Sequence, residues 1–203
     1  QRPLAQRAPL VPAGMTDGGV EGSPAGSGPS SGGKPPVLLD VMCGKLATYL
    51  RLCGYDAAYA LDRGIESDDR ILSVAADEGR VPITRDRELA ARADATDGVP
   101  DAVLLTEREV LDQLRELGAA GFPVELVAEP TRCGSCNGPV ERVAVDGAGG
   151  DRPDGVAVDR ADRPDYVPDD VGSARPGWRC ADCGRWFWKG GHWNDVAARL
   201  DRL

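Results

Sequence analysis

The chain has 203 residues, 41% of them hydrophobic and 5% aromatic, and its 26 glycines and 16 prolines indicate that a large share is loop or linker. This length accommodates one domain of about 100 residues and a small second unit. The formal net charge of -9 argues against a protein that coats nucleic acid, because such binding depends on Lys and Arg that neutralise phosphates.

A membrane protein is not expected. No segment approaches the ~20 apolar residues that cross a bilayer, and residues 1–14 lack the apolar run of a secretory signal. We therefore expect a soluble, cytoplasmic protein with no membrane partner, and the sequence does not indicate its oligomeric state. In a reducing cytoplasm the six cysteines are interpreted as metal ligands or buried thiols before disulfides.

The first 36 residues are rich in Pro, Gly and Ser, and residues 18–33 approach low complexity. Such a segment cannot bury enough apolar surface to offset the conformational entropy lost on folding. We predict a disordered extension over residues 1–36.

Order is expected from Val37, where strand and helix patterns begin to alternate. The predicted strands cover residues 37–40, 56–60, 81–84, 102–105 and 124–127. The predicted helices cover residues 44–52, 68–77 and 87–93, and a fourth runs from a capping box of Thr106 and Glu109 to about Leu117, while Ser67 is the N-cap of the second. This alternation predicts a three-layer α/β domain with a central parallel sheet over residues 37–128.

Residues 129–203 are organised by cysteine pairs instead. An insert of about residues 144–176 separates the pairs, and its segment from Asp146 to Asp170 holds eight Asp against three Arg. Because that composition is charged and rich in Gly and Pro, we predict a solvated loop inside a small second domain.

Two Cys-x-x-Cys pairs carry the strongest chemical signal. They are formed by Cys133 with Cys136 and by Cys180 with Cys183, and 43 residues lie between them. Four thiolates fill the tetrahedral shell of zinc, so we predict one structural zinc in a zinc ribbon. The alternatives are two disulfides or a redox Cys-x-x-Cys. Cys43 and Cys53, which flank an apolar helix, are interpreted as core thiols.

The last 26 residues combine aromatic and basic side chains. All four tryptophans lie there, among several Arg and Lys residues. Rings that stack on bases and cations that contact phosphates are typical of single-stranded nucleic acid binding. The alternative is that the tryptophans form the ribbon core, and we expect this of at least two. The predicted RNA contacts here are Arg185, Trp188 and His192.

A second candidate metal site is acidic. In a parallel sheet ligands bind at the carboxyl ends of the strands, where Asp40 and Asp86 are expected, and Asp68 and Asp69 begin the intervening helix. Converging carboxylates are stable when a cation neutralises them, and oxygen ligands favour Mg or Mn. Such an ion on Asp40, Asp68 and Asp86 could activate water against a phosphodiester. The alternative is that these residues are caps or turns. The predicted phosphate contacts are Lys45, Arg85 and Arg87.

Motifs in both halves occur in the order typical of one family. They are Leu39–Ala47, Leu50–Asp56, Glu78–Arg80, Thr84–Leu89, Thr131–Cys133, Cys136–Gly138, Cys183–Arg185 and then Trp188, Gly190, Gly191, His192 and Trp193. Over residues 37–196, the insert excepted, the chain resembles the Mut-seven C-terminal RNase domain family.

The resemblance implies a PIN-like nuclease domain fused to a zinc ribbon, with metal-dependent ribonuclease activity and RNA as partner. It assigns catalytic acids to Asp40, Asp68 and Asp86. A further acid that PIN nucleases carry has no clear equivalent, and Glu66 or Asp69 could take its place. A non-catalytic RNA-binding or ribosome-associated adaptor is the alternative function, and a toxin of a toxin–antitoxin pair is a third.

Overall fold

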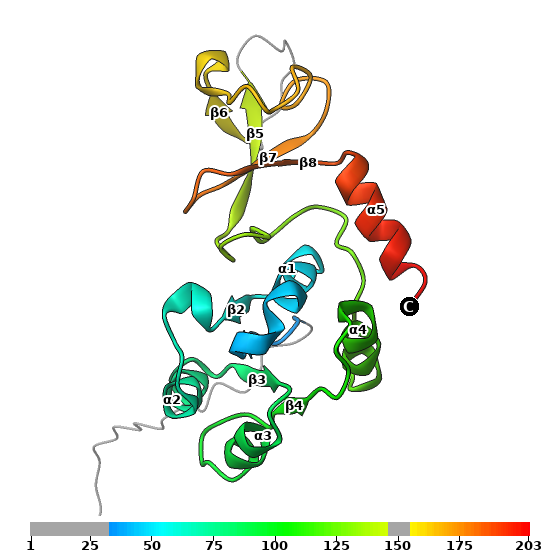
Figure 1. Ribbon diagram of the computed structural model, residues 1–203. Coiled ribbons are helices and arrows are strands. Elements are labelled where there is room, and N and C mark those ends of the chain that lie inside the picture. The colour runs from blue at the N-terminus through cyan, green and yellow to red at the C-terminus, as the bar shows by residue number, and fades with distance from the viewer. Residues whose placement is uncertain (1–32, 146–154) are drawn as a thin grey trace, which may run out of the picture. The chain divides into compact units, whose positions relative to one another are not determined.

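The structure is a computed structural model that describes residues 33–145 and 155–203 (Figure 1). The described residues belong to one compact unit with two four-stranded sheets. Most of the predicted disordered extension, residues 1–32, lies outside the described residues. Within residues 33–145 and 155–203, no helix is long and apolar enough to cross a membrane.

The first sheet is parallel throughout, as predicted. Its strands are β1 (Val37–Leu39), β2 (Ala57–Tyr59), β3 (Val81–Thr84) and β4 (Val103–Leu104), in the order β2-β1-β3-β4. Val37 is in register with Ala57 on one side and with Val81 on the other, and Ile83 is in register with Val103. The shared register places the carboxyl ends of β1 and β3 side by side.

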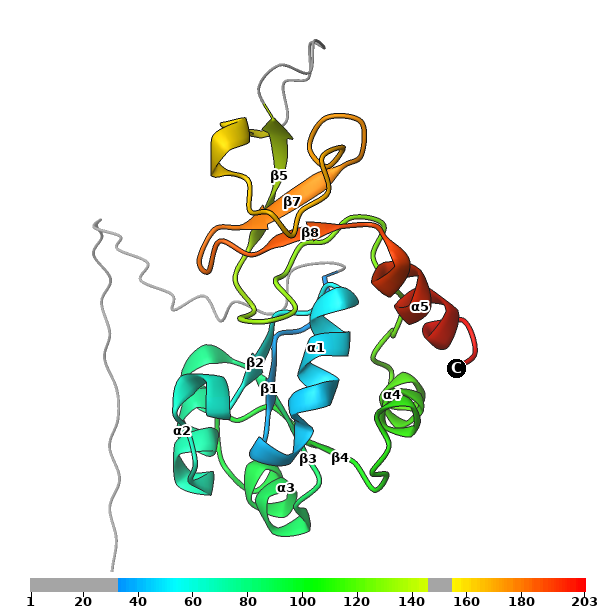
Figure 2. The same cartoon turned by 45° about the horizontal axis from the view of Figure 1, so that its top comes forward.

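Helices cover both faces of this sheet (Figure 2). They are α1 (Gly44–Leu52), α2 (Asp68–Glu78), α3 (Arg87–Asp94) and α4 (Val110–Ala119), with short 3-10 turns at Val41–Cys43 and Leu61–Arg63. Val37 and Leu39 pack with α1 and α4, whereas Leu38 packs with α2 and α3. This alternation is the period of two expected of strand side chains, and it produces the predicted three layers.

Two predicted features of this domain are wrong. Residues 124–127 form no strand; Val124 and Leu126 instead pack against the α1 and α4 cluster. The capping box is also absent, because α4 begins three residues later than predicted, with Glu109 at its N-cap and no side-chain cap hydrogen bond. The Thr106 hydroxyl and backbone N–H donate instead to Glu116, one helix turn from the end of α4.

The second sheet belongs to the ribbon. It contains β5 (Val140–Val145), β6 (Val156–Val158), β7 (Gly177–Cys180) and β8 (Trp186–Trp188), in the order β6-β5-β7-β8. The β5–β7 and β7–β8 pairs are antiparallel and β5–β6 is parallel. Trp178 and Trp186 are buried, as expected of at least two tryptophans.

The acidic insert is not simply a solvated loop, so that prediction is wrong for its described part. Residues 155–176 supply β6 and a 3-10 turn at Arg160–Asp162. Val158, Val167 and Val171 are buried with Trp186 in the ribbon core. Residues 146–154 of the insert lie outside the described residues.

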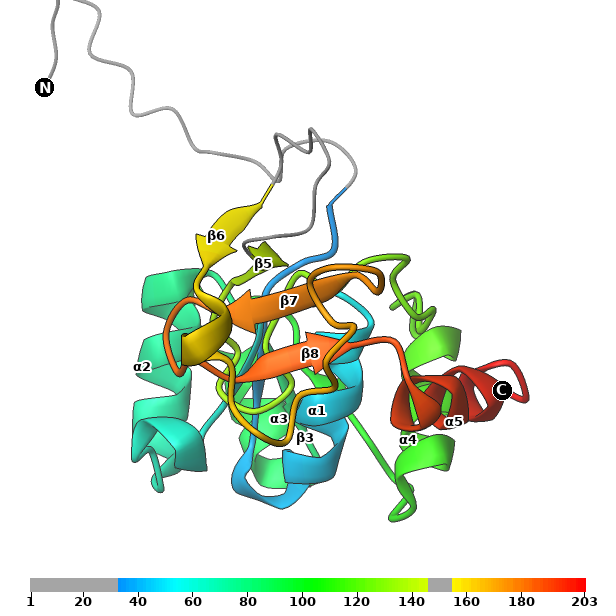
Figure 3. The same ribbon diagram turned by 90° about the horizontal axis from the view of Figure 1, so that it is seen from above.

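The last helix, α5 (Gly191–Leu200), returns to the first domain and runs beside α4 (Figure 3). Its Val196 and Leu200 are buried in the same cluster as the α1 and α4 side chains. Arg199 donates to the Tyr49 hydroxyl of α1 at 3.1 Å. The ribbon is thereby anchored to the α/β layers at its carboxyl end.

Glu78, at the end of α2, is paired with Arg63 and Arg80, and these pairs are expected to make the fold sensitive to acid. Hydrogen bonds from Arg63, and then from Arg80, lower the pKa of Glu78 to about 2 from 4.5. A depressed carboxyl pKa stabilises the fold above the unfolded value, and that contribution is lost as pH falls from about 4.5 through 2. We expect the free energy of unfolding, measured by urea titration, to decrease across this range.

A metal held by the predicted cysteine ligands would also dissociate in acid, because thiolates take up protons. The effect of Glu78 is therefore isolated by comparing the chain with Glu78→Gln, which should lose less stability between pH 4.5 and 2. Parallel stability curves for the two proteins would contradict this assignment.

Candidate functional site

The two cysteine pairs meet at the base of the ribbon. Cys133 and Cys136 lie at the turn before β5, Cys180 is the last residue of β7, and Cys183 lies in the turn between β7 and β8. Their four sulfurs lie within 4.8 Å of one another, with 3.6 Å between Cys133 and Cys183 and 3.5 Å between Cys136 and Cys180. Tetrahedral zinc with bonds of about 2.3 Å separates sulfurs by about 3.8 Å.

These separations fit four thiolates around one ion and exceed the disulfide bond length of about 2.05 Å. The Cys136 and Cys183 N–H groups point at the Cys133 and Cys180 sulfurs, each at 3.5 Å. Asn137 and Gly184 follow the pairs with positive φ, which turns the backbone around the sulfurs. The residues therefore fit a closed, structural zinc site, as predicted.

The first cysteine turn is also bonded to the edge of the parallel sheet. The Asn137 side chain accepts from the Ala57 N–H at 2.9 Å and donates to Asp56 at 2.7 Å, covering an exposed edge of β2. Arg51 of α1 donates to the Gly134 and Ser135 carbonyls at 3.3 and 2.9 Å. The first cysteine turn and the α/β domain are thus held together by hydrogen bonds as well as by α5.

Arg51 is the central residue of this junction. Its side chain is 3% exposed, pairs with Asp62 at 2.9 Å and also donates to the Ala57 carbonyl. We expect Arg51→Leu to lower the free energy of unfolding by about 3 kcal/mol, because the buried Ala57 carbonyl and two part-buried carbonyls lose their donor and Asp62 loses its partner. Urea unfolding of the zinc-loaded chain measures this.

A matched control is Arg70→Leu, on the exposed surface of α2, which should change stability by no more than about 0.5 kcal/mol. Arg51→Lys should recover only part of the loss, since an ammonium lacks the planar fork that reaches several carbonyls. Equal stability of Arg51→Leu and Arg70→Leu would contradict the role given to Arg51.

Two predicted acids lie at the shared carboxyl edge of β1 and β3. Asp40 is 5% exposed and accepts from the Thr84 hydroxyl at 2.9 Å. The same Thr84 oxygen accepts from the Asp86 N–H at 2.9 Å. One hydroxyl therefore joins the Asp40 carboxylate to the backbone of Asp86. The Asp86 side chain caps α3 by accepting from the N–H groups of Glu88 and Leu89.

The other predicted acids are engaged elsewhere. Asp68 pairs with Arg92 of α3 at 3.2 Å, and Asp69 pairs with the same guanidinium. Among residues 33–145 and 155–203, the four cysteines are the one set of three or more ligand side chains close enough together to hold a metal. The structure thus places Asp40 and Asp86 at one edge, but it does not gather Asp40, Asp68 and Asp86 around a common point.

The predicted phosphate contacts differ in their surroundings. Lys45 and Arg87 are exposed on the first turns of α1 and α3. Arg85 is half-buried, and within the described residues its Nε is a buried donor with no hydrogen-bond partner. Arg85 stands between Thr84 and Asp86 in the chain, so its guanidinium belongs to the loop that follows β3.

Glu116 was not predicted from the sequence as a site residue. It lies close enough to Arg85 for the two charges to attract each other. Burial raises the pKa of Glu116, but hydrogen bonds from Thr106 and Glu107 and the charge of Arg85 hold it below its ordinary value.

Burial, and next the charge of Asp40, raise the pKa of Cys43 to about 12. Cys43 is therefore a protonated core thiol, as interpreted, and not a nucleophile.

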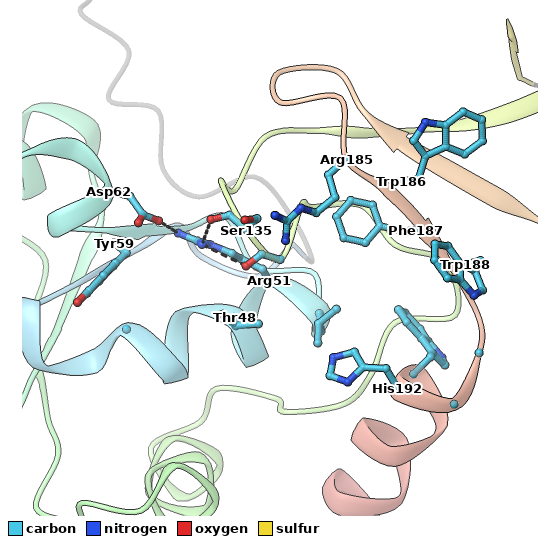
Figure 4. A pocket seen from close by; sticks show the side chains of 16 residues that line it. Thr48, Arg51, Tyr59, Asp62, Ser135, Arg185, Trp186, Phe187, Trp188 and His192 are labelled. Atoms are coloured by element: carbon cyan, nitrogen blue, oxygen red, sulfur yellow. Dashed lines mark hydrogen bonds and ion pairs between the residues drawn. The ribbon is translucent and has the colours of Figure 1, made fainter. Parts of the chain in front are cut away.

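The predicted RNA contacts of the ribbon lie together on a cavity. Arg185, Trp188 and His192 line a space of about 620 Å³ whose opposite wall is α1 (Figure 4). That wall and its neighbours were not predicted from the sequence; they include Gly44, Thr48, Tyr59 and Phe187. No local pattern could identify them, because they come from segments more than 120 residues apart.

Comparison with known proteins gives one match. A family model described as the Mut7-C RNAse domain matches residues 35–200, which include both sheets and all five helices. No curated protein and no solved structure matches the chain.

Proposed function

Because the chain belongs to the Mut7-C RNAse domain family, we propose that it is a ribonuclease whose reaction centre is the acidic edge of the parallel sheet. The observation that carries this proposal is the bridge from the Asp40 carboxylate through Thr84 to Asp86. Arg85, which precedes Asp86 in the chain, has an Nε with no hydrogen-bond partner among the described residues. A buried carboxylate and an arginine that follow neighbouring strands at one sheet edge are suited to a reaction on a phosphate.

In hydrolysis, a water oxygen bonds to phosphorus, the P–O bond to the leaving ribose breaks, and that oxygen takes up a proton. Asp40 and Asp86 would accept the proton of the attacking water or orient that water, and Arg85 would bind the phosphate oxygens. A bound Mg or Mn ion would lower the pKa of water and neutralise developing charge. Asp40 and Asp86 would hold it, whereas Asp68 fits only if it leaves Arg92.

The ribbon would contribute structure and RNA contact. Its zinc would be purely structural because four thiolates leave no open position for water. Arg185, Trp188 and His192 would contact RNA from the cavity that they line.

The direct test is cleavage of a short, unstructured, end-labelled RNA by the zinc-loaded chain with added Mg or Mn, with product lengths read from a gel. We expect cleavage that depends on the added ion, and no cleavage of the same-sequence DNA. Intact RNA under every divalent ion would contradict the proposal.

A non-catalytic RNA-binding adaptor is the second candidate, and the pairing of Asp68 and Asp69 with Arg92 favours it. The adaptor would bind RNA without added divalent ion and never cleave it. The same assay therefore separates the two functions.

A further inference from the structure

The cavity between α1 and the β8–α5 segment has the composition of a nucleotide site. We propose that it binds an unpaired base of single-stranded RNA together with an adjoining phosphate, which deepens the ribonuclease function proposed above and rests on it. Its volume of about 620 Å³ lies within the range of small-ligand sites, about 300–1,000 Å³.

Aromatic rings supply the base contacts. On β8, Trp186 is buried in the ribbon core, and the next residue, Phe187, projects from the other face of the strand into the cavity (Figure 4). Phe187 is half-buried but belongs to no hydrophobic cluster of the described residues. Trp193 of α5 lines the same space and is likewise outside those clusters. Unpaired bases stack on such rings.

One guanidinium supplies the phosphate contact. Arg185 is exposed on the cavity, and within the described residues its side chain makes no hydrogen bond or ion pair. Arg51, the other arginine of the lining, is already neutralised by Asp62 and bonded to carbonyls. In a chain of net charge -9, an unpaired cation beside rings marks a specific anion site rather than a generally basic surface.

The cavity also adjoins the acidic edge. Tyr59, in its wall, donates its hydroxyl to the Val41 carbonyl at 2.7 Å, and the Val41 N–H donates to Asp40. Gly44, the first residue of α1, allows this approach, because a Cβ there would meet the Tyr59 ring at 2.9 Å. A base held in the cavity would therefore contact Gly44 and Tyr59, which adjoin the turn from Asp40 to Cys43. Bases in a duplex are stacked and paired, so the site selects single strands.

The test measures binding of a fluorescein-labelled oligouridylate to the zinc-loaded full chain by anisotropy, without added divalent ion so that no cleavage intervenes. Arg185→Ala removes the unpaired cation, and Thr48→Trp fills the cavity from an exposed position on α1. We expect each to weaken binding about tenfold, the typical effect of losing one stacked base or charged contact. Arg202→Ala removes an exposed arginine outside the lining and should bind as the unchanged chain does.

Zinc content and near-ultraviolet circular dichroism show whether each variant is folded. If one variant does not fold, the other still tests the proposal. A duplex of the same length should bind at least about tenfold more weakly than the single strand. The proposal is overturned if folded Arg185→Ala and Thr48→Trp bind like the unchanged chain, or if the duplex binds equally well. Absence of cleavage with cavity-dependent binding would overturn only the ribonuclease function.

Discussion

Removal of zinc is expected to release one ion per chain and to unfold the β5–β8 sheet. The core of this sheet is small and consists of Val143, Val145, Val158, Val167, Val171 and Trp186. Structural zinc contributes about 10–16 kcal/mol of apparent binding free energy in small zinc domains, far more than such a core supplies. Elemental analysis measures the zinc, and near-ultraviolet circular dichroism measures the packing of Trp178 and Trp186.

Cys183→Ser is the sharpest variant for this prediction, because Cys183 is exposed and its loss removes little packing. The matched control is Cys53→Ala, which changes a buried thiol of the α/β domain and should keep its zinc. A ribbon that retains its tryptophan signal in Cys183→Ser without zinc would contradict the assignment. A ribbon that unfolds on treatment with reductant alone would support the disulfide alternative.

The largest expected effect on activity comes from the two edge carboxylates. Asp40→Asn and Asp86→Asn should each lower kcat/KM for RNA cleavage by about 100-fold or more, because an amide neither accepts the proton nor holds a cation as a carboxylate does. Asp86→Asn preserves the cap of α3, because one side-chain oxygen accepts from both Glu88 and Leu89 and Asn caps helices as well as Asp does. Asp40 accepts from the Val41 N–H at one oxygen and from the Thr84 hydroxyl at the other, so an Asn oxygen keeps only one of these two bonds. Near-ultraviolet circular dichroism therefore has to show that Asp40→Asn is folded.

The control for these variants is Glu88→Gln, which neutralises an exposed acid two residues from Asp86 in the first turn of α3. It should cleave at the rate of the unchanged chain. If all three variants cleaved RNA equally well, the reaction centre would lie elsewhere.

Helices and strands were predictable where the spacing of apolar residues and the residues that end an element indicate the same boundaries. The four strands and first three helices of the α/β domain follow from alternating apolar residues, and glycines end α2 and the second 3-10 turn. Val124–Val127 has the same apolar character but forms no strand. Val124 and Leu126 are partly buried against α1 and α4 instead of in the sheet. The Val127 N–H donates to the Leu52 carbonyl at 3.4 Å, not to a neighbouring strand. Periodicity reports burial and does not identify the partner.

Strand β6 (Val156–Val158) of the ribbon could not be predicted from the average composition of the insert. The insert is dominated by Asp, Gly and Pro, yet Val158, Val167 and Val171 are enough to extend the ribbon core. Three spaced valines change the mean hydropathy of such a segment very little, so a compositional argument could only predict a loop.

The two metal predictions differ in how local their information is. A Cys-x-x-Cys pair sets its own geometry within four residues, so the four-cysteine cluster was predictable from spacing. The acidic site depends on partners in other elements, and Arg92 of α3, which pairs with Asp68, is 24 residues away in the chain. The sequence suggested which acids lie near the edge, but not which of them a guanidinium occupies.

The most direct test of the proposed reaction centre is a crystal of the zinc-loaded chain soaked in manganese, examined by anomalous scattering. The zinc peak at the four cysteines is an internal control for metal detection. We expect a separate manganese peak at the carboxylates of Asp40 and Asp86. A zinc peak at the cysteines with no manganese peak at these two residues would contradict a metal-dependent reaction at the sheet edge.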